Sequence, residues 1–143
     1  MSVFTDNLRD NINQRSHMAK TILIVDDEPE FCKMLESRLS KEGYEIILAG
    51  DGESALRKVK LFKPDLIILD VSMPKMDGGE VYQKLQENVK TQKIPVIFLT
   101  ALKAKEDDFS LGYDVGLFTV FAKPFDPKEL LGTIREMLGK APL

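Results

Sequence analysis

The chain has 143 residues, 43% of them hydrophobic and 30% charged, which suits one compact globular domain with an apolar core. A net charge of −3 offers no basic surface for nucleic acid, and the apolar runs are far too short to cross a membrane. The single cysteine, Cys32, excludes an internal disulfide and is typical of a reducing compartment. We therefore expect a soluble, cytoplasmic domain that binds neither nucleic acid nor membrane by itself.

The first 18 residues differ from the rest of the chain, because they are rich in polar residues and lack a sustained apolar period. The sequence Ser-His-Met-Ala-Lys at 16–20 resembles a cloning junction placed before a natural start at Met18. We predict a flexible arm over 1–18, which a vector could have supplied, followed by one domain over 19–143. A short amphipathic helix through Phe4, Leu8 and Ile12 is the alternative for the arm.

From Thr21 onwards, short aliphatic runs alternate with segments of helical period. In chain order the pattern predicts a strand over 21–25, a helix from Pro29 to about Gly43 with Phe31, Met34, Leu35 and Leu39 on its apolar face, a strand over 45–49, a helix over 53–61, a strand over 65–69, a helix marked by Val81, Leu85 and Val89, a strand over 96–99, a charged helix over 105–113, a strand over 119–122, and a helix from Pro127 to about Gly139. The strands lack polar interruptions, so we expect both faces of the sheet to be covered.

Five consecutive strand–helix units indicate an α/β fold with a parallel sheet. Because crossovers are right-handed, the simplest topology is a doubly wound five-stranded sheet in the flavodoxin-like order 2-1-3-4-5, with five helices on its two faces. In such sheets functional groups gather at the carboxyl ends of the strands.

Polar side chains stand at four of these strand ends. They are Asp26 and Asp27 with Glu28 after the first strand, Asp70 after the third, Thr100 after the fourth and Lys123 after the fifth. Two carboxylates 4 Å apart repel by about 4 kcal/mol at an effective dielectric near 20, so the cluster calls for a cation. All-oxygen ligands without histidine or thiolate favour Mg²⁺.

A carboxylate, a divalent cation and a lysine together suit phosphoryl transfer to an aspartate. Spacing alone does not decide which carboxylate is the nucleophile. Asp70 is the better candidate because it closes a buried strand alone, whereas Asp26 and Asp27 are adjacent, as a metal-holding pair would be. Each residue also has an ordinary explanation, since acids before a proline-started helix are often N-caps, but capping does not explain all four strand ends together.

Four blocks of the chain resemble the response-regulator receiver domains of two-component signalling, the CheY-like family. The blocks are Ile-Leu-Ile-Val-Asp26-Asp27-Glu28-Pro, Leu-Ile-Ile-Leu-Asp70-Val-Ser-Met-Pro-Lys-Met-Asp77-Gly78, Val-Ile-Phe-Leu-Thr100-Ala101 and Phe-Ala-Lys123-Pro124-Phe125. The resemblance covers roughly residues 20–138 and keeps the order of the blocks.

This resemblance implies a phosphorylation-activated switch. Asp70 would be phosphorylated by a sensor histidine kinase or a histidine phosphotransfer protein, and Lys123 and Thr100 would contact the phosphoryl group. The domain would catalyse its own phosphorylation and dephosphorylation without being a metabolic enzyme. Its docking to a downstream protein, which the sequence does not identify, would change.

The resemblance also implies a set of magnesium ligands. Asp27 and Asp70 would bind Mg²⁺ together with the backbone carbonyl of Ser72, and Asp26 would assist through water.

The chain departs from the family near its fifth predicted strand. The position three residues before Lys123 is usually Tyr or Phe and is Val120 here, and the segment between Thr100 and Asp108 is about one residue longer than usual. A short β-branched side chain cannot swing between buried and exposed positions as an aromatic ring does. We therefore expect phosphorylation to shift the loop 100–105 and the following helix, with little change at Val120.

Three other functions each predict different residues at these positions. A flavodoxin-like cofactor binder would need free amides after the first strand, where Asp26, Asp27 and Glu28 would repel a phosphate. A phosphohydrolase with an aspartyl nucleophile would have a second acid where this chain has Ser72. A structural module would need none of these groups. The chain ends shortly after the last predicted helix, so we expect no output domain within it. Whether it is a stand-alone receiver or one domain of a larger protein stays open.

Overall fold

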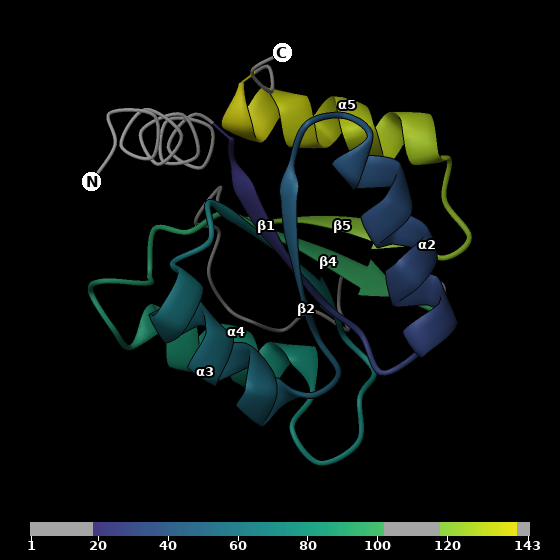
Figure 1. Ribbon diagram of the computed structural model, residues 1–143. Helices are drawn as coiled ribbons and strands as arrows, with labels where there is room; N and C mark the ends of the chain where they lie inside the picture. Colours follow the sequence, from purple (N-terminus) through teal and green to yellow (C-terminus); the bar gives the residue numbers. More distant parts are fainter. Residues whose placement is uncertain (1–18, 102–117, 140–143) are drawn as a thin grey trace, which may run out of the picture.

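The computed structural model describes residues 19–101 and 118–139 of the chain. In these residues four helices pack around a central five-stranded sheet (Figure 1). The strands are β1 (Thr21–Val25), β2 (Glu45–Ala49), β3 (Leu66–Asp70), β4 (Val96–Thr100) and β5 (Phe118–Ala122). The helices are α2 (Pro29–Ser40), α3 (Gly52–Phe62), α4 (Gly78–Gln86) and α5 (Pro127–Leu138). None of these helices has the length and apolar character that a membrane span requires.

The five strands form one parallel sheet in the order β2-β1-β3-β4-β5, which confirms the predicted topology. Its register aligns the carboxyl ends of neighbouring strands, because Val25 pairs with Leu69 and Thr100 pairs with Ala122. Residues that follow one strand therefore lie beside residues that follow the next. Four of the five predicted helices are present in the described residues, and the predicted helix over 105–113, the arm over 1–18 and most of the loop after Thr100 lie outside them.

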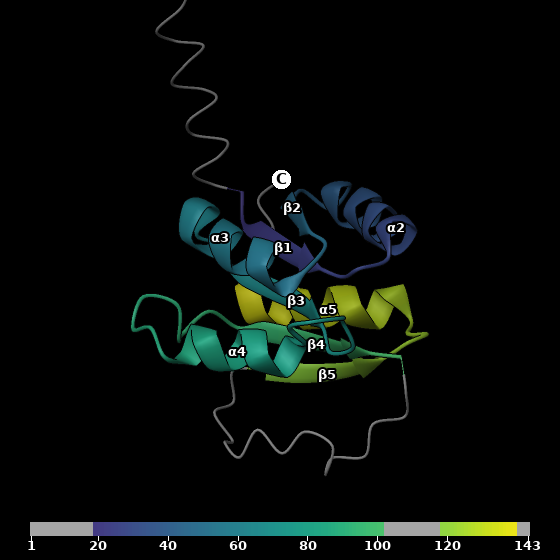
Figure 2. The same cartoon turned by 90° about the horizontal axis from the view of Figure 1, so that it is seen from below.

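Helices cover both faces of the sheet, with α2 and α5 on one face and α3 and α4 on the other (Figures 1 and 2). Successive strand residues point to opposite faces, so β1 sends Ile22 and Ile24 toward α2 and α5 and Leu23 and Val25 toward α3 and α4. Strand β3 is buried along its whole length, as its uninterrupted apolar sequence predicts. Burial on both faces fixes β3, and with it Asp70, in a rigid part of the fold.

The helix α4 is shorter than the sequence pattern predicts. Val89, expected on its apolar face, lies beyond the end of the helix and is 77% exposed, so that prediction was wrong. Two side chains end the helix: the hydroxyl of Thr91 donates to the carbonyl oxygen of Leu85 at 2.6 Å, and the Asn88 side chain accepts from the backbone N–H of Lys90 at 2.9 Å. Such local hydrogen bonds compete with further helix formation.

The first helix also ends earlier than predicted, at Ser40, with Gly43 in a left-handed turn at φ 96°. Its buried residues are Cys32, Leu35 and Leu39, whereas Met34, predicted on the apolar face, is exposed. The strand β3 runs one residue further than predicted and includes Asp70 itself. The side chain of Asp70 therefore leaves the last residue of a buried strand.

Candidate phosphorylation site

Three aspartates meet at the carboxyl edge of the sheet. Asp26 and Asp27 follow β1, Asp70 ends the adjacent strand β3, and one carboxylate oxygen from each lies within 4.8 Å of the others. Asp26 and Asp70 are buried and Asp27 is exposed. The parallel pairing of β1 with β3 is what brings residues more than 40 positions apart to one point.

The backbone around the cluster orients two of the carboxylates. Asp26 accepts a hydrogen bond from the backbone N–H of Glu28 at 3.0 Å, and Asp70 accepts one from the N–H of Ser72 at 3.2 Å. The N-cap of α2 is Glu28, which makes no side-chain capping bond. Helix capping therefore does not account for the acids at the end of β1.

Lys123 supplies the positive charge of the site. Its Nζ lies 2.6 Å from a carboxylate oxygen of Asp26 and 3.6 Å from one of Glu28, and its side chain is only 14% exposed. The backbone N–H of Lys123 donates to the carbonyl oxygen of Thr100, which joins the ends of β5 and β4. Thr100 itself is buried at this edge, so all the predicted strand-end residues lie at the same carboxyl edge of the sheet.

The crowding of charges shifts two ionisation equilibria. Burial and the negative charge of Asp26 raise the pKa of Asp70 from 3.8 to about 6, although Lys123 and the N–H of Ser72 act in the opposite direction. Burial alone would lower the pKa of Lys123, but its hydrogen bond to Asp26 and the charges of Asp26, Asp70 and Glu28 raise it above its ordinary value. Lys123 is therefore a full cation, and it does not neutralise the three acids.

The donor set fits a hard divalent cation. Two buried carboxylates and one exposed carboxylate share a small volume with one lysine, so a further positive charge would relieve their repulsion. All three donors are oxygens, and the exposed Asp27 leaves a side open to solvent, as Mg²⁺ requires because it retains water ligands. The structure places Ser72 next to Asp70 through its N–H, while the predicted role of its carbonyl oxygen stays a prediction.

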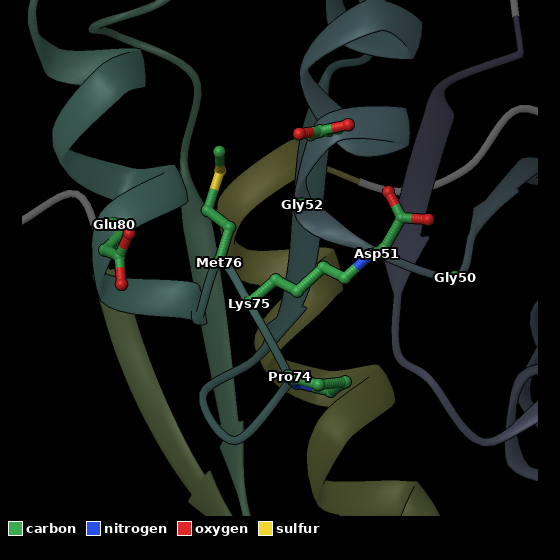
Figure 3. Close-up of a pocket in the computed structure, with 8 residues that line it drawn as sticks. Gly50, Asp51, Gly52, Pro74, Lys75, Met76 and Glu80 are labelled. Atoms are coloured by element: carbon green, nitrogen blue, oxygen red, sulfur yellow. The ribbon is translucent and has the colours of Figure 1, made fainter.

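A separate pocket of about 490 Å³ lies beside the cluster, between the loop after β2 and the loop after β3 (Figure 3). It is lined by Gly50, Asp51, Gly52, Glu53, Pro74, Lys75, Met76 and Glu80. None of the three clustered aspartates lines it. A shallower hollow of about 210 Å³ is lined by Asp26 and Asp27, so these two members of the acidic cluster face an open surface hollow and not the larger pocket.

One residue of the site was not assigned a functional role from the sequence. Phe31 of α2 was expected to be an ordinary core residue, yet its ring lies under the ammonium group of Lys123, 4.1 Å from Nζ to the ring centroid. No local pattern signals this contact, because the two residues are 92 positions apart. Glu28, noted only as part of an acidic run, also reaches Lys123.

Comparisons with known proteins agree with this geometry. Residues 22–135 match the model of the response regulator receiver domain family. The chain is 42% identical over 126 residues to the alkaline phosphatase synthesis transcriptional regulatory protein PhoP of Bacillus subtilis, and 47% identical over 121 residues to the probable transcriptional regulator ycf27 of Cyanophora paradoxa. These matches cover 87% and 85% of this chain but 50% and 49% of the relatives, so the chain spans about half their length.

Solved structures give the same result. The chemotaxis protein CheY4 of Vibrio cholerae superimposes with a TM-score of 0.77 at 32% identity, covering 84% of this chain and 99% of that one. The response regulator TrrA of Thermotoga maritima, solved in complex with Mg(2+)-BeF, superimposes with a TM-score of 0.70 at 36% identity, covering 83% of this chain and 99% of that one.

The chain therefore belongs to the response regulator receiver domain family, as its sequence blocks indicated. Proteins of this family are phosphorylation-dependent switches of two-component signalling and not metabolic enzymes.

Proposed function

We propose that this domain accepts a phosphoryl group on Asp70 from a phosphohistidine donor, in a Mg²⁺-dependent reaction, and that phosphorylation changes its docking to a partner. The observation that supports the proposal is the meeting of Asp26, Asp27 and Asp70 at one edge, with the cation of Lys123 beside them.

The side chains suit each step of the transfer. A carboxylate oxygen of Asp70 attacks phosphorus and forms a P–O bond, while the P–N bond of the donor breaks and the imidazole leaves with its electron pair. Lys123 balances the negative charge that moves onto Asp70, and the hydroxyl of Thr100 donates to a phosphoryl oxygen. In dephosphorylation, water attacks phosphorus, the P–O bond to Asp70 breaks, the carboxylate of Asp70 is restored, and inorganic phosphate leaves.

Asp27 and Asp70 would hold Mg²⁺ together with the backbone carbonyl of Ser72, and Asp26 would assist through water. When bound, the ion supplies Lewis-acid stabilisation of the phosphoryl oxygens. The complex of TrrA with Mg(2+)-BeF supports this assignment by similarity. The residues of this chain hold the proposed nucleophile, Asp70, in position and place the charge of Lys123 beside it.

The partners follow from the same chemistry. A sensor histidine kinase or a histidine phosphotransfer protein would supply the phosphoryl group in the cytoplasm. Two similar proteins carry the names of transcriptional regulators, and on this similarity we propose control of transcription as the output of the signal. The downstream protein is unidentified.

Incubation with acetyl phosphate and Mg²⁺, followed by intact-mass spectrometry, tests the proposal. We expect one added phosphoryl group on the wild-type domain, and none after removal of Mg²⁺ with a chelator or in the variant Asp70→Asn. The matched control is Asp77→Asn, because Asp77 caps α4 near the site but lies outside the cluster. Undiminished labelling of Asp70→Asn would contradict the assignment of the nucleophile.

The same experiment separates the alternatives. A lasting acyl phosphate supports a receiver domain. Multiple rapid turnovers of the phosphodonor would support a phosphohydrolase, and no reaction would support a purely structural module.

A further inference from the structure

An aromatic ring lies against the lysine of the site. The Nζ atom of Lys123 is 4.1 Å from the centroid of the Phe31 ring, well within the 6 Å over which a cation is attracted to an aromatic face. Phe31 belongs to α2, two residues into the helix that follows the acidic loop, and Lys123 follows β5. The contact therefore connects helix α2 to the segment that follows β5.

Other aromatic side chains hold the Phe31 ring in place. Phe125 packs edge-on against it with a centroid separation of 6.0 Å and an interplanar angle of 89°, and Phe121 packs edge-on against Phe125 at 6.1 Å and 70°. All three rings are partly buried against the core between the sheet and the helices α2 and α5. Edge-to-face packing of this kind limits where the Phe31 ring can lie.

The ammonium group of Lys123 has few other contacts in the described residues. Its ion-pair partners there are Asp26 at 2.6 Å and Glu28 at 3.6 Å, and Asp70 is not among them. The side chain of Lys123 is only 14% exposed, so water solvates its charge far less in the folded chain than in the unfolded chain. On the remaining side the negative face of the Phe31 ring supplies the compensating attraction.

We propose that Phe31 is a positioning residue for phosphoryl transfer, which holds the ammonium group of Lys123 at the acidic cluster. This inference rests on the proposed phosphorylation of Asp70. A lysine side chain has four rotatable bonds, and its ammonium group is a point charge without directional preference. The ring restricts this freedom before the reaction, so that less ordering is required when charge moves onto Asp70.

The proposal predicts a loss of rate in Phe31→Leu, which keeps an apolar side chain but removes the aromatic face. We expect phosphorylation by acetyl phosphate to slow about three- to tenfold, the range that corresponds to one partly desolvated cation–π contact. Phe31→Tyr keeps the ring and should restore most of the rate. The matched control is Phe62→Leu, which makes the same change in a half-exposed ring at the end of α3 and should leave the rate unchanged.

A spectroscopic signal separates positioning of Lys123 from a general loss of structure. Protons above an aromatic face resonate upfield, so the ε-methylene protons of Lys123, assigned by their absence in Lys123→Met, should be shifted upfield in the wild type. The shift should persist in Phe31→Tyr and Phe62→Leu and disappear in Phe31→Leu. It is measured without phosphodonor, so it reports on the contact even if Asp70 proves not to be the acceptor.

Thermal melting of each variant shows whether it is folded. Should Phe31→Leu be unfolded, pentafluorophenylalanine at position 31 replaces it, because this residue keeps a ring of similar size and reverses the sign of its face. A slowed reaction with this residue supports the proposal. Wild-type rates in Phe31→Leu or with the fluorinated ring, or an unshifted Lys123 resonance in the wild type, would overturn it. If the wild type takes no phosphoryl group, the proposed function fails separately.

Discussion

Asp70 is a buried carboxylate that shares its cluster with a second buried carboxylate, Asp26. It is 3% exposed, and burial together with the charge of Asp26 raises its pKa to about 6. The folded chain without metal therefore binds a proton at Asp70 more tightly than the unfolded chain does. The stabilising effect of this proton is present at pH 4 and is lost as the pH rises from about 4 to about 6.

This sign leads to a prediction for Asp70→Asn in the presence of a chelator. At pH 7.5 the variant should be more stable than the wild type, by on the order of 2 kcal/mol, because it removes one of two adjacent buried charges. Near pH 4, where Asp70 is protonated in the fold, the difference should be small. Thermal or urea melts across this pH range measure it. A wild type that is the more stable protein at pH 7.5 without metal would contradict this account of the cluster.

At the scale of residues, the sequence predicted which polar side chains gather but not how they are arranged. Asp26, Asp27 and Asp70 could be predicted because each stands at the end of an apolar run, and parallel strands bring such ends together. The ion-pair partner of Lys123 could not be predicted. Whether its ammonium group lies on Asp26 or on Asp70, and which ring lies beneath it, depends on contacts across 90 or more positions.

At the scale of elements, helix α4 begins directly against the strand that carries Asp70. Gly78 is its first residue, and its N–H donates to the carbonyl oxygen of Val71 at 3.0 Å. A Cβ atom built on Gly78 would clash with the backbone carbonyl oxygen of Asp70 and lie 3.0 Å from the Cα of Val71. Both obstacles are backbone atoms, so they cannot move aside as a flexible side chain would.

We therefore expect Gly78→Ala to destabilise the domain by about 1–3 kcal/mol, the range for overpacked positions, and to slow phosphorylation by displacing Asp70. Urea unfolding and the acetyl phosphate assay measure the two effects. Gly132→Ala is the control, because a Cβ atom there meets nothing within 4 Å. Alanine in place of this helical glycine should stabilise α5 by about 0.5–1 kcal/mol. If Gly78→Ala behaved like Gly132→Ala, the close approach of α4 to Asp70 would be of no consequence.

The boundaries of elements were predicted less well than their existence. The strands were clear because uninterrupted aliphatic runs of about five residues have few other uses in a soluble domain. The end of α4 was missed because Val89 continues the helical spacing of Val81 and Leu85. The hydrogen bond from Thr91 to the carbonyl oxygen of Leu85 decides this boundary, and apolar periodicity does not report on it.

At the scale of the molecule, two layers of helices cover a sheet whose carboxyl edge carries the acidic cluster and Lys123 (Figures 1 and 2). The aromatic side chains of Phe31, Phe121 and Phe125 pack on the face of the sheet that α2 and α5 cover, and the Phe31 ring contacts Lys123. Val120, at the position where the family usually has an aromatic residue, is 38% exposed. These aromatic side chains therefore lie in the layer between the sheet and the helices α2 and α5. The side chain of Val120 is not part of this layer.

The topology of the whole domain could be predicted with the rules for parallel sheets, because right-handed crossovers leave few arrangements of five strand–helix units. What the domain regulates could not be predicted, since the chain spans about half the length of the relatives it matches. The output depends on surfaces and segments that apolar periodicity does not specify.

We propose that Asp70 is the residue that takes the phosphoryl group. To test this assignment, the domain is phosphorylated with acetyl phosphate and Mg²⁺, the acyl phosphate is reduced with borohydride, and the altered residue is mapped by peptide mass spectrometry. We predict a single reduced aspartate, at Asp70, that depends on both phosphodonor and Mg²⁺. Reduction at Asp26 or Asp27 instead, or at no aspartate, would contradict the account.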